Sequence, residues 1–344
     1  MSKPALLALI IGAICGVTGY IIGMPLPWML GPMIGVTLAA ILRAPVKSPD
    51  RLRPIVIPII GVMLGSTISP DIANQISSWV TTFALLPIFL ICAAFTSYTV
   101  YRRIGQYDPT TAFFSAMPGG LNEMLLMGEE AGGDGRRIAM AHAARVLMVI
   151  VCVAIYFGLV LGVRAGPGGG NWTGLTALSA LDYLILGLCA VIGGPLAKKA
   201  RLPAAQVFGP MILSGIAHVA GWVVVAPPTL MIIAAQIAIG TVIGGRFVGS
   251  TFREVRRDLM LAFASTLSML IVAIGFAEVI ILLTKMPLAQ AFLAFAPGGL
   301  TEMSLLTLAI DQDVAFVTVT HIVRITVVIS MAPALFGLAK RWIG

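Results

Sequence analysis

Long apolar runs separated by short polar segments constrain this chain more than any other feature. A helix that crosses the hydrocarbon core of a membrane needs about 20 predominantly apolar residues. Charged residues make up only 10% of the chain and the mean hydropathy is +1.01, so folding alone cannot hide this much apolar surface from water. The sequence therefore predicts an all-α, multi-pass integral membrane protein whose partner is the lipid bilayer. The expected spans are 5–23, 27–42, 54–69, 79–101, 138–163, 182–197, 203–224, 229–245, 259–284 and 314–338.

Two further apolar stretches, 110–128 and 288–310, are each interrupted by a proline and two glycines. Proline removes a backbone donor, and glycine adopts backbone angles that other residues avoid. We expect each stretch to be a re-entrant or broken-helix hairpin, which leaves about 10 complete transmembrane helices. The unpaired backbone groups at such a break must line a cavity or pack inside the protein, because hydrocarbon cannot satisfy them.

The chain carries a net charge of +8, and its basic residues fall in short clusters between the apolar runs. In that position they set the orientation of a membrane protein, so we expect no nucleic-acid partner. With both interrupted stretches re-entrant, most of these clusters lie on the cytoplasmic side, together with the N- and C-termini. We expect Arg164 and Lys285 to be the external exceptions. The predicted cytoplasmic groups are Arg43 to Arg53, Arg102–Arg103, Arg136–Arg137, Lys198 to Arg201, Arg246 to Arg257 and Lys340–Arg341.

An internal duplication is the strongest pattern in the sequence. Pro118-Gly119-Gly120-Leu121-Asn122-Glu123-Met124 matches Pro297-Gly298-Gly299-Leu300-Thr301-Glu302-Met303, and each copy is followed at the same distance by HxxR. Each half holds an odd number of expected spans, so the second half must enter the membrane upside down relative to the first. We therefore expect two inverted five-helix repeats, 1–165 and 182–344, joined by a glycine-rich external linker at 166–181. Inverted repeats with broken helices at matching positions are typical of secondary transporters and their midplane sites.

The candidate substrate- or ion-binding residues all come from this duplication. Ionisable groups at membrane depth are functional candidates by default. The first half supplies Pro118, Gly119, Gly120, Asn122, Glu123, His142 and Arg145. The second half supplies Pro297, Gly298, Gly299, Thr301, Glu302, His321 and Arg324.

Each residue type suggests a role. Arginine keeps its charge and binds a carboxylate or phosphate as a fork, so Arg145 and Arg324 would hold an anionic cargo. A dry glutamate or a histidine could carry a coupling proton, whereas Asn122, Thr301 and unwound carbonyls could complete a sodium site. In a purely structural interpretation, each glutamate caps its own helix or pairs with the arginine of the next helix.

Other repeated or reactive residues suggest structural roles. The Gly-Pro-Met elements at Gly31 and Gly209, and small residues spaced by four in the helices that follow, indicate close helix packing. Asp134 and Asp313 are expected mainly as helix caps. The four cysteines are isolated in apolar runs and lack the spacing of a zinc site, so we expect no metal or other cofactor beyond a coupling H⁺ or Na⁺.

The duplicated PGGLxEM motif, the repeated Gly-Pro-Met element and the length together resemble the membrane AbrB family of bacteria. The resemblance covers essentially the whole chain. Members carry a gene-regulation label and are also labelled as ammonia monooxygenases, and they differ from the small soluble DNA-binding regulator of the same name. The resemblance thus implies a duplicated inner-membrane protein.

Three functions follow from these observations. The first is a secondary transporter of a small organic anion, with no enzymatic activity and with a homo-oligomer as a compatible assembly. The second is a membrane sensor or regulatory protein that acts indirectly on gene expression. The third is a membrane monooxygenase component, which would need clustered metal ligands although the chain has three histidines.

Overall fold

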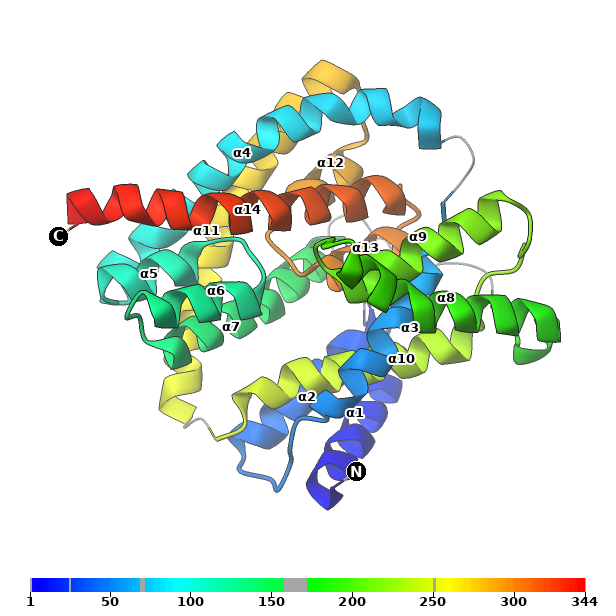
Figure 1. Ribbon diagram of the computed structural model, residues 1–344. Helices are drawn as coiled ribbons and strands as arrows, with labels where there is room; N and C mark the ends of the chain where they lie inside the picture. Colours follow the sequence, from blue (N-terminus) through cyan, green and yellow to red (C-terminus); the bar gives the residue numbers. More distant parts are fainter. Residues whose placement is uncertain (1, 25, 69–71, 158–171, 250–251, 344) are drawn as a thin grey trace. The chain divides into compact units, whose positions relative to one another are not determined.

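The computed structural model describes residues 2–24, 26–68, 72–157, 172–249 and 252–343 (Figure 1). All regular secondary structure in these residues is helical, as the composition predicts. The predicted linker glycines 166–170, together with Arg164, lie outside the described residues. The helices are α1 (Lys3–Ile21), α2 (Pro27–Ile41), α3 (Arg53–Gly65), α4 (Ile72–Arg103), α5 (Pro109–Ala116), α6 (Leu121–Glu130), α7 (Gly135–Ile155), α8 (Ala180–Lys199), α9 (Ala205–Val219), α10 (Thr229–Gly244), α11 (Phe252–Thr284), α12 (Leu288–Phe295), α13 (Leu300–Ala309) and α14 (Val314–Ile343).

The helices of the two halves correspond in order, α1 to α7 with α8 to α14. The short helices α5 and α12, before each Pro-Gly-Gly segment, both have 8 residues. The helices after it, α6 and α13, both have 10 residues. The duplication seen in the sequence is therefore repeated in the order and length of the helices.

Six described helical segments are long and apolar enough to cross a membrane. Four other expected spans coincide with α2, α3, α7 and α9. Helices α2 and α9 have 15 residues each and would extend about 22 Å, short of the roughly 30 Å of a bilayer core. The count of ten spans therefore remains a prediction. The six segments are Lys3–Ile21, Trp79–Arg103, Ala180–Lys199, Thr229–Phe247, Arg256–Thr284 and Val314–Leu338.

The chain divides into two compact units, and each unit takes segments from both halves of the sequence. Unit 1 comprises 1–75, 151–251 and 301–315, and thus holds α1 to α3, α8 to α10 and α13. Unit 2 comprises 76–150, 252–300 and 316–344, and holds most of α4 to α7, α11, α12 and α14.

In unit 1, glycines bring helices of the two halves together. A Cβ atom at Gly61 of α3 would lie 2.5 Å from the carbonyl oxygen of Val207 in α9. In the matching contact, a Cβ at Gly240 of α10 would collide with the carbonyl oxygen of Met29 in α2. No side chain fits in either contact, so these glycines serve the close packing that their spacing predicts.

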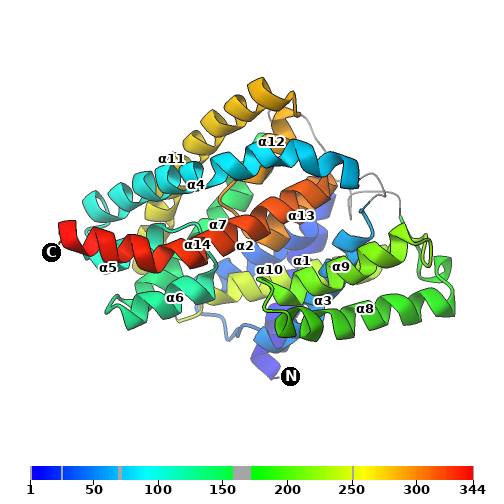
Figure 2. The same ribbon diagram turned by 45° about the horizontal axis from the view of Figure 1, so that its top comes forward.

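In unit 2, α4 and α14 run side by side in both views (Figures 1 and 2). The hydroxyl groups of Ser97 in α4 and Ser265 in α11 are hydrogen-bonded at 2.6 Å, which joins the two long helices. Phe89 of α4 packs its ring against Phe276 and Phe295, with centroids 5.6 and 5.0 Å away. Unit 2 is the part of the molecule that holds both helix breaks.

Candidate functional site

Each Pro-Gly-Gly segment is an extended break between two short helices. At the first break, Met117 and Gly120 have extended backbone angles, and α6 restarts at Leu121. None of the glycines of either break has a positive φ, so the freedom to adopt unusual angles is not why glycine occurs here. Close approach is the reason at the first break, because a Cβ at Gly119 would lie 2.8 Å from Cγ1 of Val328 in α14. The expectation about glycine angles was therefore wrong, although the break occurs where it was predicted.

Arg145 of α7 satisfies backbone carbonyls that the first break exposes. Its Nη1 donates to the carbonyl oxygen of Met117 at 2.8 Å, and its Nη2 makes a longer contact of 3.4 Å with that of Gly119. Nη2 also donates to Nδ1 of His142 at 2.9 Å, and Nε2 of His142 faces the carbonyl oxygen of Phe114 at 2.9 Å. Since arginine can only donate and a carbonyl can only accept, His142 must be neutral with its proton on Nε2.

Arg324 of α14 satisfies backbone carbonyls of the second break in the same way. It donates from Nη1 to the carbonyl oxygen of Ala296 at 2.7 Å and from Nη2 to that of Gly298 at 2.5 Å. Nε2 of His321 lies 3.0 Å from the carbonyl oxygen of Leu293. These bonds span the same sequence separations, 28 and 26 residues, as those of Arg145. The arginine of each HxxR motif thus stabilises the break by satisfying its unpaired carbonyl oxygens.

The two arginines also concentrate positive charge inside unit 2. Both are 3% exposed, and within the described residues neither forms an ion pair with a carboxylate. The Nε–H group of each is buried and has no hydrogen-bond partner among the residues that the structure describes. Buried charges without a counter-ion are costly, so this arrangement favours binding of an anion.

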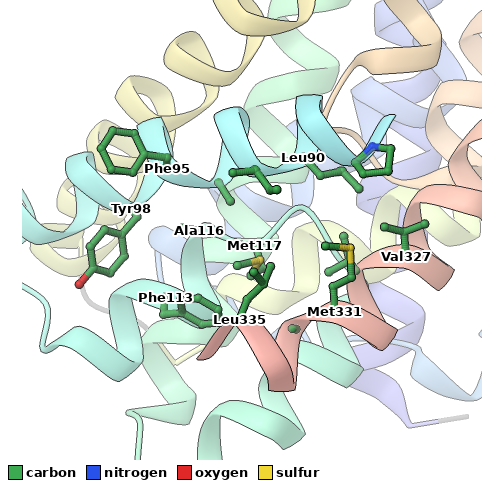
Figure 3. Close-up of a pocket in the computed structure, with 14 residues that line it drawn as sticks. Leu90, Phe95, Tyr98, Phe113, Ala116, Met117, Val327, Met331 and Leu335 are labelled. Carbon is green, nitrogen blue, oxygen red and sulfur yellow. The ribbon is translucent and has the colours of Figure 1, made fainter. Parts of the chain in front are cut away.

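An apolar pocket of about 390 Å³ lies beside the first break, between α4, α5 and α14 (Figure 3). Its lining includes the side chain of Met117, whose carbonyl oxygen accepts from Arg145. Sequence reasoning missed this pocket. Its lining residues are Pro87, Leu90, Ile91, Ala94, Phe95, Tyr98, Phe113, Ala116, Met117, Val327, Val328, Met331, Ala332 and Leu335.

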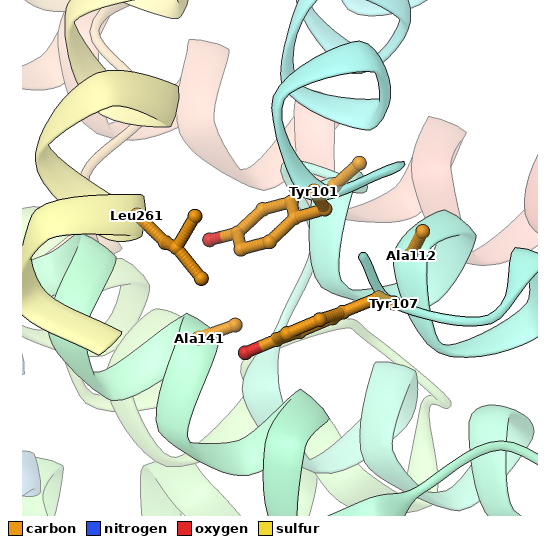
Figure 4. Close-up of a cluster of buried hydrophobic side chains, with 6 residues drawn as sticks. Tyr101, Tyr107, Ala112, Ala141 and Leu261 are labelled. Atoms are coloured by element: carbon orange, nitrogen blue, oxygen red, sulfur yellow. The ribbon is translucent and has the colours of Figure 1, made fainter. Parts of the chain in front are cut away.

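A buried tyrosine pair fixes the connection from α4 to α5 (Figure 4). The rings of Tyr101 and Tyr107 lie 5.4 Å apart and are almost fully buried. The guanidinium of Arg137 lies 5.1 Å from the ring centre of Tyr107, and Arg102 donates to the carbonyl oxygen of Tyr107 at 2.5 Å. Burial raises the pKa of Tyr107, and the charge of Asp258 acts in the same direction, so this phenol stays protonated.

The two glutamates of the duplicated motif are placed differently. Glu123 is exposed, and its carboxylate folds back over Gly120 at the start of α6, where a Cβ would collide with it. In the described residues it forms no ion pair with Arg145. Glu302 is 7% exposed and lies in the first turn of α13, directly after Thr301.

The remaining predicted residues are distributed over both units. Thr301 and Glu302 belong to unit 1, whereas the hydrogen bonds of both arginines lie within unit 2. The side chain of Asn122 lies outside what the structure describes. Asp134 caps α7 as predicted, because its carboxylate accepts from the backbone N–H of Arg137 at 3.1 Å. Among the described residues, no group of three or more His, Cys, Asp or Glu side chains is placed to hold a metal ion.

Comparison with known proteins identifies relatives along most of the chain. A protein from Bacillus subtilis (strain 168) with the name "Uncharacterized protein YhjN" is 26% identical over 273 residues, which cover 76% of this chain and 71% of the relative. A protein from Escherichia coli (strain K12) with the name "Putative regulator AbrB" is 24% identical over 258 residues, which cover 75% of this chain and 74% of the relative. The family model described as "Transition state regulatory protein AbrB" matches residues 28–340, which include both helix breaks and both HxxR motifs. This helical membrane protein therefore belongs to the AbrB family.

Proposed function

We propose that this protein is a secondary transporter of the bacterial inner membrane that moves a small organic anion together with a proton or a sodium ion. The observation that carries the proposal is the pair of buried arginines, Arg145 and Arg324, which have no acidic partner in the described residues. A guanidinium has five N–H donors, and Arg324 uses two of them on the second break. Three donors therefore remain for a carboxylate or phosphate of the cargo.

The proposed architecture has two inverted repeats with cytoplasmic termini. With five spans in each half, the second half would cross the membrane in the opposite direction to the first. Support comes from the matching helix order and from the corresponding hydrogen bonds that Arg145 and Arg324 donate to carbonyl oxygens at the two breaks. Broken helices at matching positions of two halves are a pointer to a transport site near the midplane.

The coupled ion is proposed to depend on Glu302 rather than on His142. Nδ1 of His142 accepts from Arg145, and a proton on that nitrogen would face a guanidinium that can only donate. Glu302 is a buried carboxyl group with a hydroxyl neighbour, Thr301. These two side chains could serve either a proton or, with unwound carbonyls, a sodium ion.

A membrane sensor is the second candidate function. The description of the family and the name of the Escherichia coli relative both mention regulation. If the protein is a sensor, the anion would bind at the same two arginines without being carried across the membrane. The two functions differ in whether binding leads to net flux.

Flux into proteoliposomes distinguishes these functions. Purified protein would be tested with a panel of labelled mono-, di- and tricarboxylates under an imposed proton or sodium gradient. We expect uptake by the unmodified protein and its loss in the double variant R145A/R324A. The matched control is Arg256→Ala, because Arg256 is an exposed arginine of α11.

The readouts separate folding from transport. Each variant must give a symmetric gel-filtration peak before its flux is interpreted, since the arginines also satisfy buried carbonyls. Binding of a carboxylate without flux in the unmodified protein would favour the sensor. If the unmodified protein shows no binding and no flux with any member of the panel, the assignment of the arginines to an anion is contradicted.

A further inference from the structure

The pocket beside the first break combines an apolar chamber with a nearby charge. Every lining side chain is apolar except Tyr98, and the described wall comes from α4, α5 and α14 (Figure 3). The volume of about 390 Å³ falls within the range of small-molecule sites. At about 30 Å³ per heavy atom, the share of a water molecule in the liquid, it would hold on the order of ten carbon atoms.

The chamber and Arg145 are separated by a single segment of backbone. Met117 places its side chain in the pocket wall and its carbonyl oxygen 2.8 Å from Nη1 of Arg145. Val328 also lines the pocket and contacts Gly119, whose carbonyl oxygen lies 3.4 Å from Nη2 of Arg145. Arg145 does not itself line the pocket, so a molecule with its tail there would place its head at the break segment whose carbonyl oxygens Arg145 bonds.

The two halves differ at the residue that leaves this space open. Ala116 lines the pocket, and the matching residue of the second half is Phe295. The ring of Phe295 is fully buried and packs against Phe89 and Phe276, at 5.0 and 5.8 Å between centroids. A phenyl ring thus occupies the place at the second break that a methyl group occupies at the first.

We propose that the anion recognised at the first break is amphiphilic, with an apolar tail in the pocket and a carboxylate directed toward Arg145. This inference rests on the proposed function and narrows its substrate class to carboxylates with an apolar tail of up to about ten carbon atoms. The apolar pocket matches the tail of such a molecule, and the positive charge of Arg145 matches its carboxylate. An acyl chain of a membrane lipid is the competing occupant.

A chain-length series tests the inference. The probes are straight-chain carboxylates from acetate to dodecanoate, with binding measured to the protein in lipid nanodiscs after subtraction of empty nanodiscs. We expect each added methylene to tighten binding about fourfold until the pocket is full, and no further gain beyond about ten carbons. Equal affinities for acetate and decanoate would overturn the inference and leave anion binding intact.

Ala116→Phe fills the pocket with the side chain that the second half carries at this position. We expect it to retain acetate binding and to lose the dependence on chain length. The matched control, Ala84→Phe, adds the same ring at an exposed position of α4 that does not line the pocket. It should bind the series like the unmodified protein.

A second variant keeps the test informative if Ala116→Phe does not fold. Met331→Ala enlarges the pocket, so the affinity should continue to rise with longer chains than in the unmodified protein. If a folded Ala116→Phe protein keeps the same dependence of affinity on chain length, the inference is overturned. The inference is also overturned if this variant loses a co-purifying lipid while the dependence on chain length is unchanged. If no carboxylate of any length binds the unmodified protein, the proposed function and this inference both fail.

Discussion

The first helix break, between α5 and α6, and the second, between α12 and α13, share one hydrogen-bond pattern but have different surroundings. At each break, an arginine two helices further along donates to the carbonyls of the interrupted segment. Ala116 borders a pocket at the first break, whereas Phe295 occupies the matching place at the second. Glu123 is exposed and Glu302 is buried. The repeated motif thus specifies the hydrogen bonds from arginine to the break carbonyls. The positions where the two copies differ determine the chemical surroundings of each break.

The largest expected difference between the breaks concerns the two glutamates. Glu302→Gln should lower coupled uptake roughly tenfold or more, equivalent to at least about 1.4 kcal/mol, because a buried ionisable group in a membrane protein is a functional candidate. Glu123→Gln should retain most of the uptake, since this carboxylate is exposed. The measurement is initial uptake by proteoliposomes under an ion gradient. Equal losses in the two variants would show that exposure does not distinguish the glutamates.

The histidines should differ by less. His142 bonds to both Phe114 and Arg145, whereas Nδ1 of His321 has no partner in the described residues. His142→Leu should therefore reduce the free energy of unfolding by about 1 kcal/mol more than His321→Leu, the typical net value of one hydrogen bond. Thermal melts of the two variants in the same detergent provide the comparison. A larger loss for His321→Leu would contradict the hydrogen-bond assignment.

The smallest expected difference lies at the start of the helix before each break. The carboxylate of Asp108 accepts from the backbone N–H of Thr111 at 2.9 Å, whereas the matching helix α12 follows Pro287 without a side-chain cap. Asp108→Ala should cost about 0.5 kcal/mol at neutral pH, the lower end of the range for a helix cap, because Asp108 is exposed. Glu130→Ala is the control, because Glu130 is exposed at the end of α6.

The effect of Asp108→Ala should also depend on pH. Burial acts to raise the pKa of the Asp108 carboxyl, but its hydrogen bonds to Thr111 and neighbouring backbone outweigh burial and hold the pKa below its ordinary value. A lowered pKa stabilises the folded state above the pKa of the unfolded chain, and this contribution is lost as the pH falls through the folded value. The difference in melting temperature between the variant and the unmodified protein should therefore narrow below about pH 4. A constant difference from pH 7 to pH 3 would rule out a role for the charge of Asp108.

Helix positions could be predicted closely because apolar runs and proline-glycine breaks are local features. The expected span 229–245 is α10 (Thr229–Gly244), and the interrupted stretch 288–310 became α12 and α13. The helix bounds depend on which residues can enter the bilayer and on where the backbone loses its donors.

The bonding of the site could be predicted only in part. The matched HxxR motifs identified Arg145 and Arg324, but not that their donors would serve break carbonyls rather than carboxylates. The pocket was missed because its walls come from three helices, although the change from Ala116 to Phe295 between the halves was a visible signal.

The sequence by itself determined that this chain is a duplicated helical membrane protein with two interrupted helices, since hydropathy and repeats are read along one chain. Only the tertiary structure decided which carbonyls each arginine satisfies, which glutamate is buried and where an empty space remains. The reason is that hydrogen bonds, burial and cavities depend on segments far apart in the sequence, such as Met117 and Val328, being brought together. Backbone groups left unpaired by a break must find partners within the fold, and the fold alone selects them.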